Sequence, residues 1–493
     1  PRNLETALLT VSNIHKIAAK EVSGEQAIDY FNVFLAPFVK GLSPTEVKEK
    51  MRFFLFNLNQ WVSREGFPIS TTFGIELAVP DFIERKEAIG PEGRTVGHYS
   101  GFVEESRLIA STLLELMEDS DKNSPMFNPS LIIKIRPETF KSKECEPLLF
   151  QSHKLAAEKG LPYFANLCSK KQKFSSYTAT GCRLAAEWKE DWELDTLQTG
   201  TVDSVILNLP RSIYEAEGKP QALYKFLDEQ LEMASRALEI KYRTLRQRMG
   251  EGLLPFLTQK INEDRYFRLE NATRLISLIG LNEAAQAFTG KPLHEDEKAL
   301  NFAEQIVKHI SQVVQKHARK PEARAVLSMV PNQNAAKRLA ELDVEKYGWA
   351  KVKAQGMKEQ PFYTDITALP LESTVSWQKR LTIEAKFHEL CPGSHLAVIQ
   401  LADSGQDPSH LLSLTREITE TYALGLYTFN RNIAHCSSCG KTFYGLPSKC
   451  PLCGSVNTLT SFSRISAKYL PESLWTKSHR STISKRVGYD FIK

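Results

Sequence analysis

The sequence predicts an α/β protein in which short buried strands alternate with amphipathic helices, followed by a small metal-binding module. Three observations support this prediction. Short apolar runs recur along the chain, and long segments carry apolar residues at helical spacing. Four of the eight cysteines lie close together, between Cys436 and Cys453. The composition, 42% hydrophobic and 25% charged, is that of a globular protein with a large core.

The helices are predicted from the spacing of apolar residues. Residues 1–60 have this spacing and predict two or three helices. Glycine and proline interrupt it at about 71–104, where we expect loops, and it returns at 105–119. Two long helices are predicted at 221–249 and 295–316, because their apolar side chains keep to one face.

Six short apolar runs predict buried strands. They are residues 130–135, 161–167, 204–209, 323–330, 395–402 and 424–429. Strands that alternate with helices are typical of an α/β sheet or barrel. The visible boundary lies near Asn430, before the cysteine-rich stretch.

Composition also limits the class of protein. A net charge of +5 over 493 residues is too small to indicate nucleic-acid binding by itself. No apolar run is long enough to predict a membrane span, and no signal peptide is visible. The sparse cysteines fit a reducing compartment, so we expect a cytoplasmic protein.

The four clustered cysteines predict a zinc ribbon. Cys436 and Cys439 form one Cys-x2-Cys pair, and Cys450 and Cys453 form a second pair after ten residues. Each pair can present two thiolates to one tetrahedral ion, and four sulfur ligands leave no position for water. The site is therefore expected to be structural rather than catalytic. Two disulfides, or four thiols without a metal, are the alternatives.

Cys182 is the candidate for chemistry among the other cysteines. It lies in a polar segment without helical periodicity and is followed by Arg183, so a loop can present its thiol into a site. Cys145, Cys168 and Cys391 lack this setting and are expected to pack as small hydrophobic residues.

Several motifs in order give the chain a family resemblance. They are YFANL, GCRLA, DWELDTLQTG, VILNLPRSIYEAEGK, PFYTDITALP, EAKFHELCPGSHLAVIQL and CSSCG…CPLCG…SRISAKYLP. Together they resemble the catalytic subunit of anaerobic (class III) ribonucleotide reductases, nearest to the archaeal-type branch. The resemblance implies a ten-stranded α/β barrel of the glycyl-radical type with a C-terminal zinc ribbon, and a central loop that carries Cys182.

The resemblance also implies the reaction. Cys182 would become a thiyl radical and take the 3′ hydrogen of a ribonucleoside triphosphate, after which the 2′ hydroxyl leaves as water. A nearby glycyl radical would be generated by a radical-SAM activating enzyme, which carries a 4Fe-4S cluster and S-adenosylmethionine. The zinc ribbon would support the glycine loop. Nucleotide effectors, formate or a thiol redox protein as reductant, and a homodimer are further implied.

The expected domains follow from the same resemblance. Residues 1–430 would form the catalytic barrel with N-terminal helices, residues 431–470 the zinc ribbon and radical-type loop, and residues 471–493 a tail. The family's first barrel strand and its ATP-cone regulatory domain would lie upstream of Pro1.

The chain departs from the family motif at the radical glycine. In RISAKYLP, Ala467 stands where the Arg-Val-x-Gly-Tyr motif has glycine, and the nearest substitute is Gly488 in KRVGYDF. Three explanations are open: an engineered substitution at Ala467, replacement by Gly488, or a homologue that lost the radical. The first and third are favoured over the second, because SRISAKYLP keeps its surroundings in register. The stretch VPNQNAAKRLAELD also lacks a Pro-Ala-Glu carboxylate that is usual in the family.

Anaerobic reduction of ribonucleoside triphosphates is therefore the expected function. The alternatives are a radical-less homologue that binds nucleotide or activase without turnover, and a zinc-ribbon protein that binds nucleic acid. Asn208 is either a substrate-binding side chain or a cap of its strand.

Overall fold

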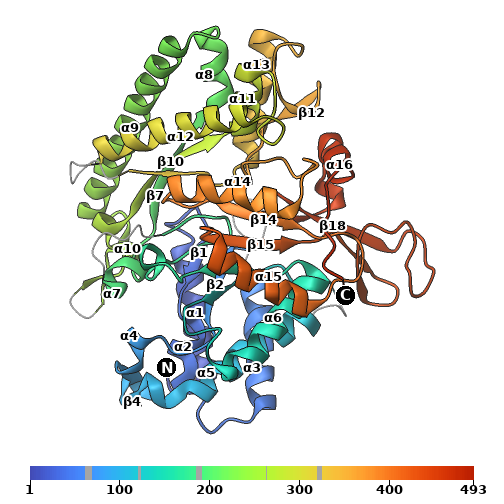
Figure 1. Ribbon diagram of the computed structural model, residues 1–493. Helices are drawn as coiled ribbons and strands as arrows, with labels where there is room; N and C mark the ends of the chain where they lie inside the picture. The colour runs from blue at the N-terminus through green and yellow to red at the C-terminus, as the bar shows by residue number, and fades with distance from the viewer. Residues whose placement is uncertain (61–68, 120–123, 185–190, 262–263, 319–324, 493) are drawn as a thin grey trace.

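The structure is a computed structural model that describes residues 1–60, 69–119, 124–184, 191–261, 264–318 and 325–492 (Figure 1). Its centre is a six-stranded sheet in the order β1-β2-β5-β6-β15-β14 and a three-stranded sheet in the order β11-β10-β7. The strands are β1 (Gln26–Ile28), β2 (Thr71–Glu76), β5 (Ser130–Ile135), β6 (Tyr163–Asn166), β7 (Thr201–Asn208), β10 (Thr273–Ile279), β11 (Val326–Ser328), β14 (Leu396–Gln400) and β15 (Leu426–Asn430).

The two sheets follow one another in a single arc. A parallel bridge between Met329 and His395 links the end of β11 to the start of β14. Strands β1, β2, β5 and β6 are parallel to one another, and β6 pairs antiparallel with β15. The remaining strands, β15, β14, β11, β10 and β7, are again parallel to their neighbours. The arc therefore has two parallel halves that run in opposite directions.

The sheets do not show the ten-stranded barrel that the resemblance implies. Six strands and three strands make nine, and within the described residues no strand pairs with the outer edges of β1 and β7. What the structure shows is a mixed α/β fold whose strands form an open arc.

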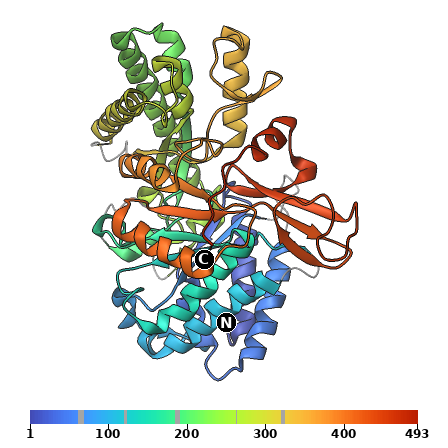
Figure 2. The same ribbon diagram turned by 45° about the vertical axis from the view of Figure 1, so that its right-hand side comes forward.

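Helices cover the outside of both halves (Figures 1 and 2). Around the first half they are α1 (Leu4–Ala18), α2 (Phe31–Leu35), α3 (Pro44–Gln60), α5 (Val103–Glu118), α6 (Glu146–Lys159) and α15 (Pro408–Thr421). Around the second half they are α8 (Leu209–Ala216), α9 (Pro220–Gly250), α11 (Leu281–Thr289), α12 (Glu297–His317), α13 (Gln333–Tyr347) and α14 (Trp377–Leu390).

The strands alternate between an outer and an inner face, as the pleat of a strand requires. Ile133 and Ile399 point into the large outer core beneath the helices. Ile132 and Val398 point the other way, into a smaller cluster inside the arc. The interior of the arc is thus a separate environment from the helix-covered outside.

Most predicted elements are confirmed. Strand β5 has the predicted bounds, and β6, β7, β14 and β15 lie within the predicted runs or close to them. Strand β11 is shorter than predicted, and residues 323–324 of that run lie outside the described residues. Helices α9 and α12 are confirmed. The prediction of loops at 71–104 is wrong at β2 and at the short elements α4 (Asp81–Glu84), β3 (Glu87–Ile89) and β4 (Thr95–His98). Strands β1 and β10 were not predicted.

The C-terminal part forms a four-stranded antiparallel sheet in the order β17-β16-β18-β19 (Figure 2). Its strands are β16 (Ile433–Cys436), β17 (Lys441–Tyr444), β18 (Leu459–Ile465) and β19 (Lys468–Pro471). Helix α16 (Lys477–Ile483) follows, and Tyr489 then pairs with Leu401 beyond the end of β14. Ile433 and Phe462 pack in the same large core as the first half of the arc.

In the part of the chain that the structure describes, no helix combines the length and apolar character that crossing a membrane requires.

Candidate functional site

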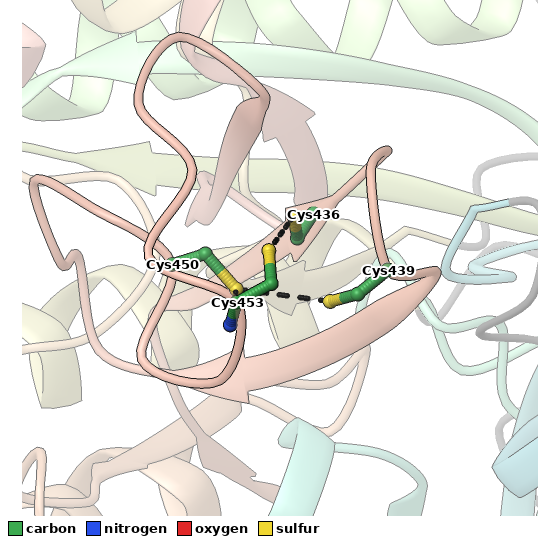
Figure 3. Close-up of side chains that lie close together, drawn as sticks. All are labelled: Cys436, Cys439, Cys450 and Cys453. Carbon is green, nitrogen blue, oxygen red and sulfur yellow. Dashed lines mark hydrogen bonds between the residues drawn. The ribbon is translucent and has the colours of Figure 1, made fainter.

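The four clustered cysteines converge on one point (Figure 3). Cys436 ends β16, Cys439 lies in the turn to β17, and Cys450 and Cys453 lie in the loop before β18. The Cys436 and Cys453 sulfurs are 3.8 Å apart, and those of Cys439 and Cys450 are 3.7 Å apart. All four sulfurs lie within 4.8 Å of one another.

These distances fit a tetrahedral metal site. With Zn–S bonds of about 2.3 Å, tetrahedral geometry separates two sulfurs by roughly 3.8 Å. A disulfide would bring them to about 2.05 Å, so the paired-disulfide alternative does not fit. Gly440 and Gly454 follow the two pairs with φ of +67° and +71°, a left-handed conformation that glycine adopts most readily. Four thiolates in this arrangement could hold one ion.

Strand β18 connects the cysteine cluster to a tight turn. Leu459, at its start, pairs with Cys436, and Ile465, at its end, pairs with Lys468 of β19. Only Ser466 and Ala467 lie between the two strands, so they form a two-residue hairpin turn. Ser466 has a φ of +55°, which such a turn requires of its first residue in the type II′ form.

The Ser466–Ala467 turn is buried and held from three sides. The Tyr163 hydroxyl donates to the Ala467 carbonyl oxygen at 2.7 Å, and Arg464 Nη1 donates to the same oxygen at 3.1 Å. Ser466 Oγ donates to Asp365 Oδ2 at 2.7 Å. Ala467 is 5% exposed. The residue at the expected radical position therefore has a fixed place against β6.

Arg464 anchors β18 to the first half of the arc. Its guanidinium donates to the Gly160 carbonyl and the Asn430 side chain, each at 3.1 Å, and also contacts the Tyr163 hydroxyl. Burial raises the pKa of Tyr163 to about 12, so the phenol keeps its proton and remains a donor at neutral pH. Burial also raises the pKa of Asp365 to about 6.

Cys182 lies on a narrow hairpin inside the arc. Tyr177 and Arg183 form an isolated antiparallel bridge, and Thr178 N donates to the Cys182 carbonyl at 2.9 Å. At the tip, Ala179 N donates to Thr72 Oγ1 at 3.1 Å, which attaches the hairpin to β2. A Cβ on Gly181 would lie 3.4 Å from Leu396 of β14. The hairpin thus crosses the interior of the arc and contacts both β2 and β14.

The Cys182 thiol is deep in the protein but not sealed. Its sulfur lies 3.6 Å from Thr201 Oγ1, at the start of β7. Burial raises the pKa of this thiol to about 11, yet the residue keeps part of its surface accessible. The thiol is therefore protonated at neutral pH.

The Cys182 hairpin and the Ser466–Ala467 turn meet the same interior cluster. Tyr163, which holds Ala467, packs in one apolar cluster with Tyr177 and Ala179 of the hairpin. Ile366, next to the Asp365 that holds Ser466, belongs to the same cluster. The structure therefore brings the surroundings of Cys182 and Ala467 together, although they are far apart in sequence.

Local packing explains why glycine occupies position 488 and asparagine occupies position 208. A Cβ on Gly488 would lie 2.6 Å from Ala402 Cα, so glycine permits the tail to pair closely with the end of β14. Asn208 caps α8 by accepting from Arg211 N at 3.1 Å, and its amide donates to Asp343 at 3.0 Å. Neither observation tests a radical role for Gly488 or substrate binding by Asn208.

Sequence reasoning missed four residues of this site. They are Glu25, Tyr163, Asp365 and Arg464. The last three lie within YFANL, PFYTDITALP and SRISAKYLP, so the motifs themselves carried a signal. Glu25 follows Gly24 without any motif, and only the fold brings it to the Cys182 hairpin.

Comparisons with known proteins point to one family. A family model described as anaerobic ribonucleoside-triphosphate reductase matches residues 1–489. The anaerobic ribonucleoside-triphosphate reductase of Salmonella typhimurium is 26% identical over 494 aligned residues, which cover 92% of this chain and 66% of the relative. The chain thus spans slightly less than two thirds of that relative's length.

Solved structures show the same fold. An anaerobic ribonucleotide reductase matches 99% of this chain and 77% of its own with a TM-score of 0.81 and 19% identity. The enzyme from Thermotoga maritima, with dATP bound in its specificity site, matches 96% of this chain and 77% of its own with a TM-score of 0.77 and 18% identity.

Proposed function

Because the chain belongs to the anaerobic ribonucleoside-triphosphate reductase family, we propose that it reduces ribonucleoside triphosphates to deoxyribonucleotides without oxygen. The observation that carries the proposal is the meeting of the Cys182 hairpin and the Ser466–Ala467 turn at one interior cluster. A family match over nearly the whole chain gives no support to a separate nucleic-acid-binding role for the cysteine cluster.

Cys182 would perform the hydrogen transfer. As a thiyl radical it takes the 3′ hydrogen atom of the ribose and becomes a thiol, and the 2′ hydroxyl leaves with a proton as water. A reductant, formate or a thiol redox protein, supplies the two electrons, and the thiol returns a hydrogen atom to the 3′ carbon. The burial of the Cys182 thiol supports this role, because solvent would quench a radical.

The cysteine cluster would bind a structural zinc. Four sulfur ligands leave no open position on the ion, so its contribution is to fix the loops around it. Strand β18, seven residues and about 20 Å long, then connects this fixed point with the Ser466–Ala467 turn. Zinc would in this way fix the start of β18, while Tyr163 and Arg464 hold the turn at its end.

The arc would be completed to a ten-stranded barrel by one further strand between β1 and β7. Strand β10 is buried throughout, whereas its neighbour β7 is partly exposed along most of its length. An edge strand with unpaired backbone groups can accept another strand.

The partners and domains of the family extend the proposal. Ribonucleoside triphosphates, nucleotide effectors, a radical-SAM activating enzyme and a second copy of the chain are the proposed partners. Residues 1–430 are the proposed barrel, 431–470 the ribbon with its turn, and 471–493 the tail. The pairing of Tyr489 with Leu401 attaches this tail to the barrel.

Ala467 decides whether this chain turns over. Alanine has a methyl group in place of one Cα hydrogen, so the chain as given is expected to bind nucleotide without forming the family's glycyl radical. Ala467→Gly, treated anaerobically with the activating enzyme and S-adenosylmethionine, should give a glycyl-radical EPR signal and deoxyribonucleotide product. The unsubstituted chain is the matched control.

Two further variants test the assignment. In the Ala467→Gly background, Cys182→Ser should keep the EPR signal but form no product, because the radical has no thiol to act through. Gly488→Ala in the same background should keep the signal. Product with Cys182→Ser would contradict the proposed role of Cys182, and loss of the signal from a Gly488→Ala variant whose tail stays paired with β14 would contradict the proposed role of residue 467.

A further inference from the structure

Glu25 has a position that neither its sequence context nor the proposed reaction accounts for. It lies just before β1, and its carboxylate reaches into the arc to the tip of the Cys182 hairpin. Glu25 Oε2 accepts from Thr180 N at 3.1 Å. Glu25 Oε1 accepts from Thr72 Oγ1 in a short contact.

Thr72 connects Glu25 to a second backbone amide of the tip. Its hydroxyl donates to Glu25 and accepts from Ala179 N at 3.1 Å. The two successive amides at the tip therefore depend on one carboxylate, one directly and one through Thr72. Buried amides need such partners, because an unsatisfied amide costs free energy comparable to a lost hydrogen bond.

Hydrogen bonds connect the tip of the hairpin to the backbone of Cys182. Thr180 is two residues from Cys182, and its hydroxyl lies 2.8 Å from Thr178 Oγ1. Thr178 Oγ1 in turn accepts from Cys182 N at 3.3 Å. A carboxylate that fixes Thr180 thus fixes the backbone that carries the sulfur.

Glu25 also acts on the thiol through its charge. Burial is the main cause of the raised pKa of Cys182, Thr201 opposes it, and the negative charge of Glu25 raises the pKa further. Hydrogen-atom transfer needs an S–H bond, which a thiolate does not have. The charge of Glu25 therefore adds to the burial that keeps Cys182 in the protonated form.

We propose that Glu25 is a positioning residue for Cys182, holding the tip of its hairpin by hydrogen bonds. This inference rests on the proposed function for its purpose. The hydrogen bonds at the tip and the effect of the Glu25 charge on the thiol can nevertheless be measured without turnover.

Three variants separate the effect of the Glu25 charge from that of its hydrogen bonds. Glu25→Gln keeps the shape and one carbonyl acceptor for Thr180 N but removes the charge. Glu25→Ala removes both. Glu21→Gln is the matched control, because Glu21 lies four residues earlier and accepts instead from Phe256 N and Leu257 N of α10 (Pro255–Thr258) at 2.9 and 3.0 Å.

The first readout is the alkylation rate of Cys182 by iodoacetamide as a function of pH, followed by peptide mass spectrometry. Removing the negative charge lowers the thiol pKa and enlarges the thiolate fraction at a fixed pH. Glu25→Gln should therefore speed alkylation roughly threefold or more below the pKa. Glu21→Gln should leave the rate unchanged. An unchanged rate in Glu25→Gln would overturn the electrostatic part.

The second readout is amide hydrogen exchange at Ala179 and Thr180. Exchange should rise about tenfold or more in Glu25→Ala and much less in Glu25→Gln. Thr72→Val should release Ala179, which keeps the test available if Glu25→Ala does not fold. Unchanged exchange at the tip in both Glu25→Ala and Thr72→Val would overturn the positioning part.

The failure of this inference is distinguishable from failure of the proposed function. If Ala467→Gly forms no radical but both readouts respond, the proposed function fails while Glu25 still positions Cys182. If Ala467→Gly is active and neither readout responds to the Glu25 variants, the inference fails alone.

Discussion

Tyr163 of β6 donates a 2.7 Å hydrogen bond to the carbonyl oxygen of Ala467, so a central strand holds the tip of a hairpin that begins at the cysteine cluster. Arg464 donates to the same oxygen at 3.1 Å and also contacts the Tyr163 hydroxyl. Two buried donors on one carbonyl define where the turn sits. The position of residue 467 is therefore set by β6 as well as by its own hairpin.

Tyr163→Phe should loosen the turn without releasing it, because Arg464 remains as a donor. The expected cost is about 0.5–1.5 kcal/mol in the free energy of unfolding, the net value of one hydrogen bond. Urea denaturation measures this cost, and amide exchange at residues 466–468 should accelerate. Tyr444→Phe, on the exposed strand β17 of the same sheet, is the control and should leave exchange at the turn unchanged.

Asp365 should make stability depend on pH. Burial raises the pKa of its carboxyl to about 6, whereas an unfolded aspartate has a pKa of about 3.9. The folded protein therefore favours the protonated form. The stabilising contribution is fully present below about pH 4 and is lost as pH rises through about 6.

Asp365→Asn should remove this dependence. Relative to the unsubstituted protein, the variant should gain up to about 3 kcal/mol of unfolding free energy between pH 4 and pH 7.5. Urea denaturation at both pH values measures the difference. Parallel stability curves for the two proteins would show that the carboxyl is not destabilised as an anion.

Sequence patterns predicted the elements whose surroundings are apolar and missed those that face polar groups. Strand β5 has four buried apolar residues among its six positions, so its run is conspicuous. Strand β2 contains Thr72 and Glu76, which point to Glu25 and Arg136 inside the arc and make the run look like a loop. Strand β10 is an apolar run interrupted by arginine and serine, and such short runs do not distinguish strand from helix.

The residues of the candidate site also fall into those that the sequence predicted and those that it did not. The four cysteines were predictable because all lie within 18 residues and their spacing is imposed by the ion they could bind. Glu25 lies 155 residues from Thr180, and Tyr163 lies 304 residues from Ala467. Such pairs exist only once the sheets have formed, so a motif such as YFANL can mark Tyr163 but no local pattern shows which residue it contacts.

Metal analysis should find about one zinc per chain, and Cys436→Ser should remove it. Amide exchange should then rise across residues 436–458, while the strands of the two central sheets stay protected. This confinement is expected because Ile433 and Phe462, on either side of the cluster, pack in the large core. Thr442→Ser, in the neighbouring strand β17, is the control and should keep the metal. Unfolding of the two central sheets in Cys436→Ser would show that the boundary at Asn430 is wrong.

Gly488→Ala should detach the tail from the main sheet. The new methyl group would lie 2.6 Å from Ala402 Cα and 2.8 Å from Ala402 N, so the backbones must separate. Overpacking of this kind costs about 1–3 kcal/mol. The hydrogen bond from Ala402 N to the Tyr489 carbonyl, 3.0 Å long, should open with it.

Thermal unfolding and amide exchange at Ala402 and Tyr489 measure the effect of Gly488→Ala. Gly250→Ala, at the end of α9, is the matched control, because its Cβ would meet nothing within 4 Å and its backbone has no positive φ. That variant should be neutral or slightly stabilising, since alanine restricts the unfolded chain more than glycine does. If Gly488→Ala is as stable as Gly250→Ala, close approach of the tail is not the reason for glycine at 488. A radical role for Gly488 would then become the stronger explanation.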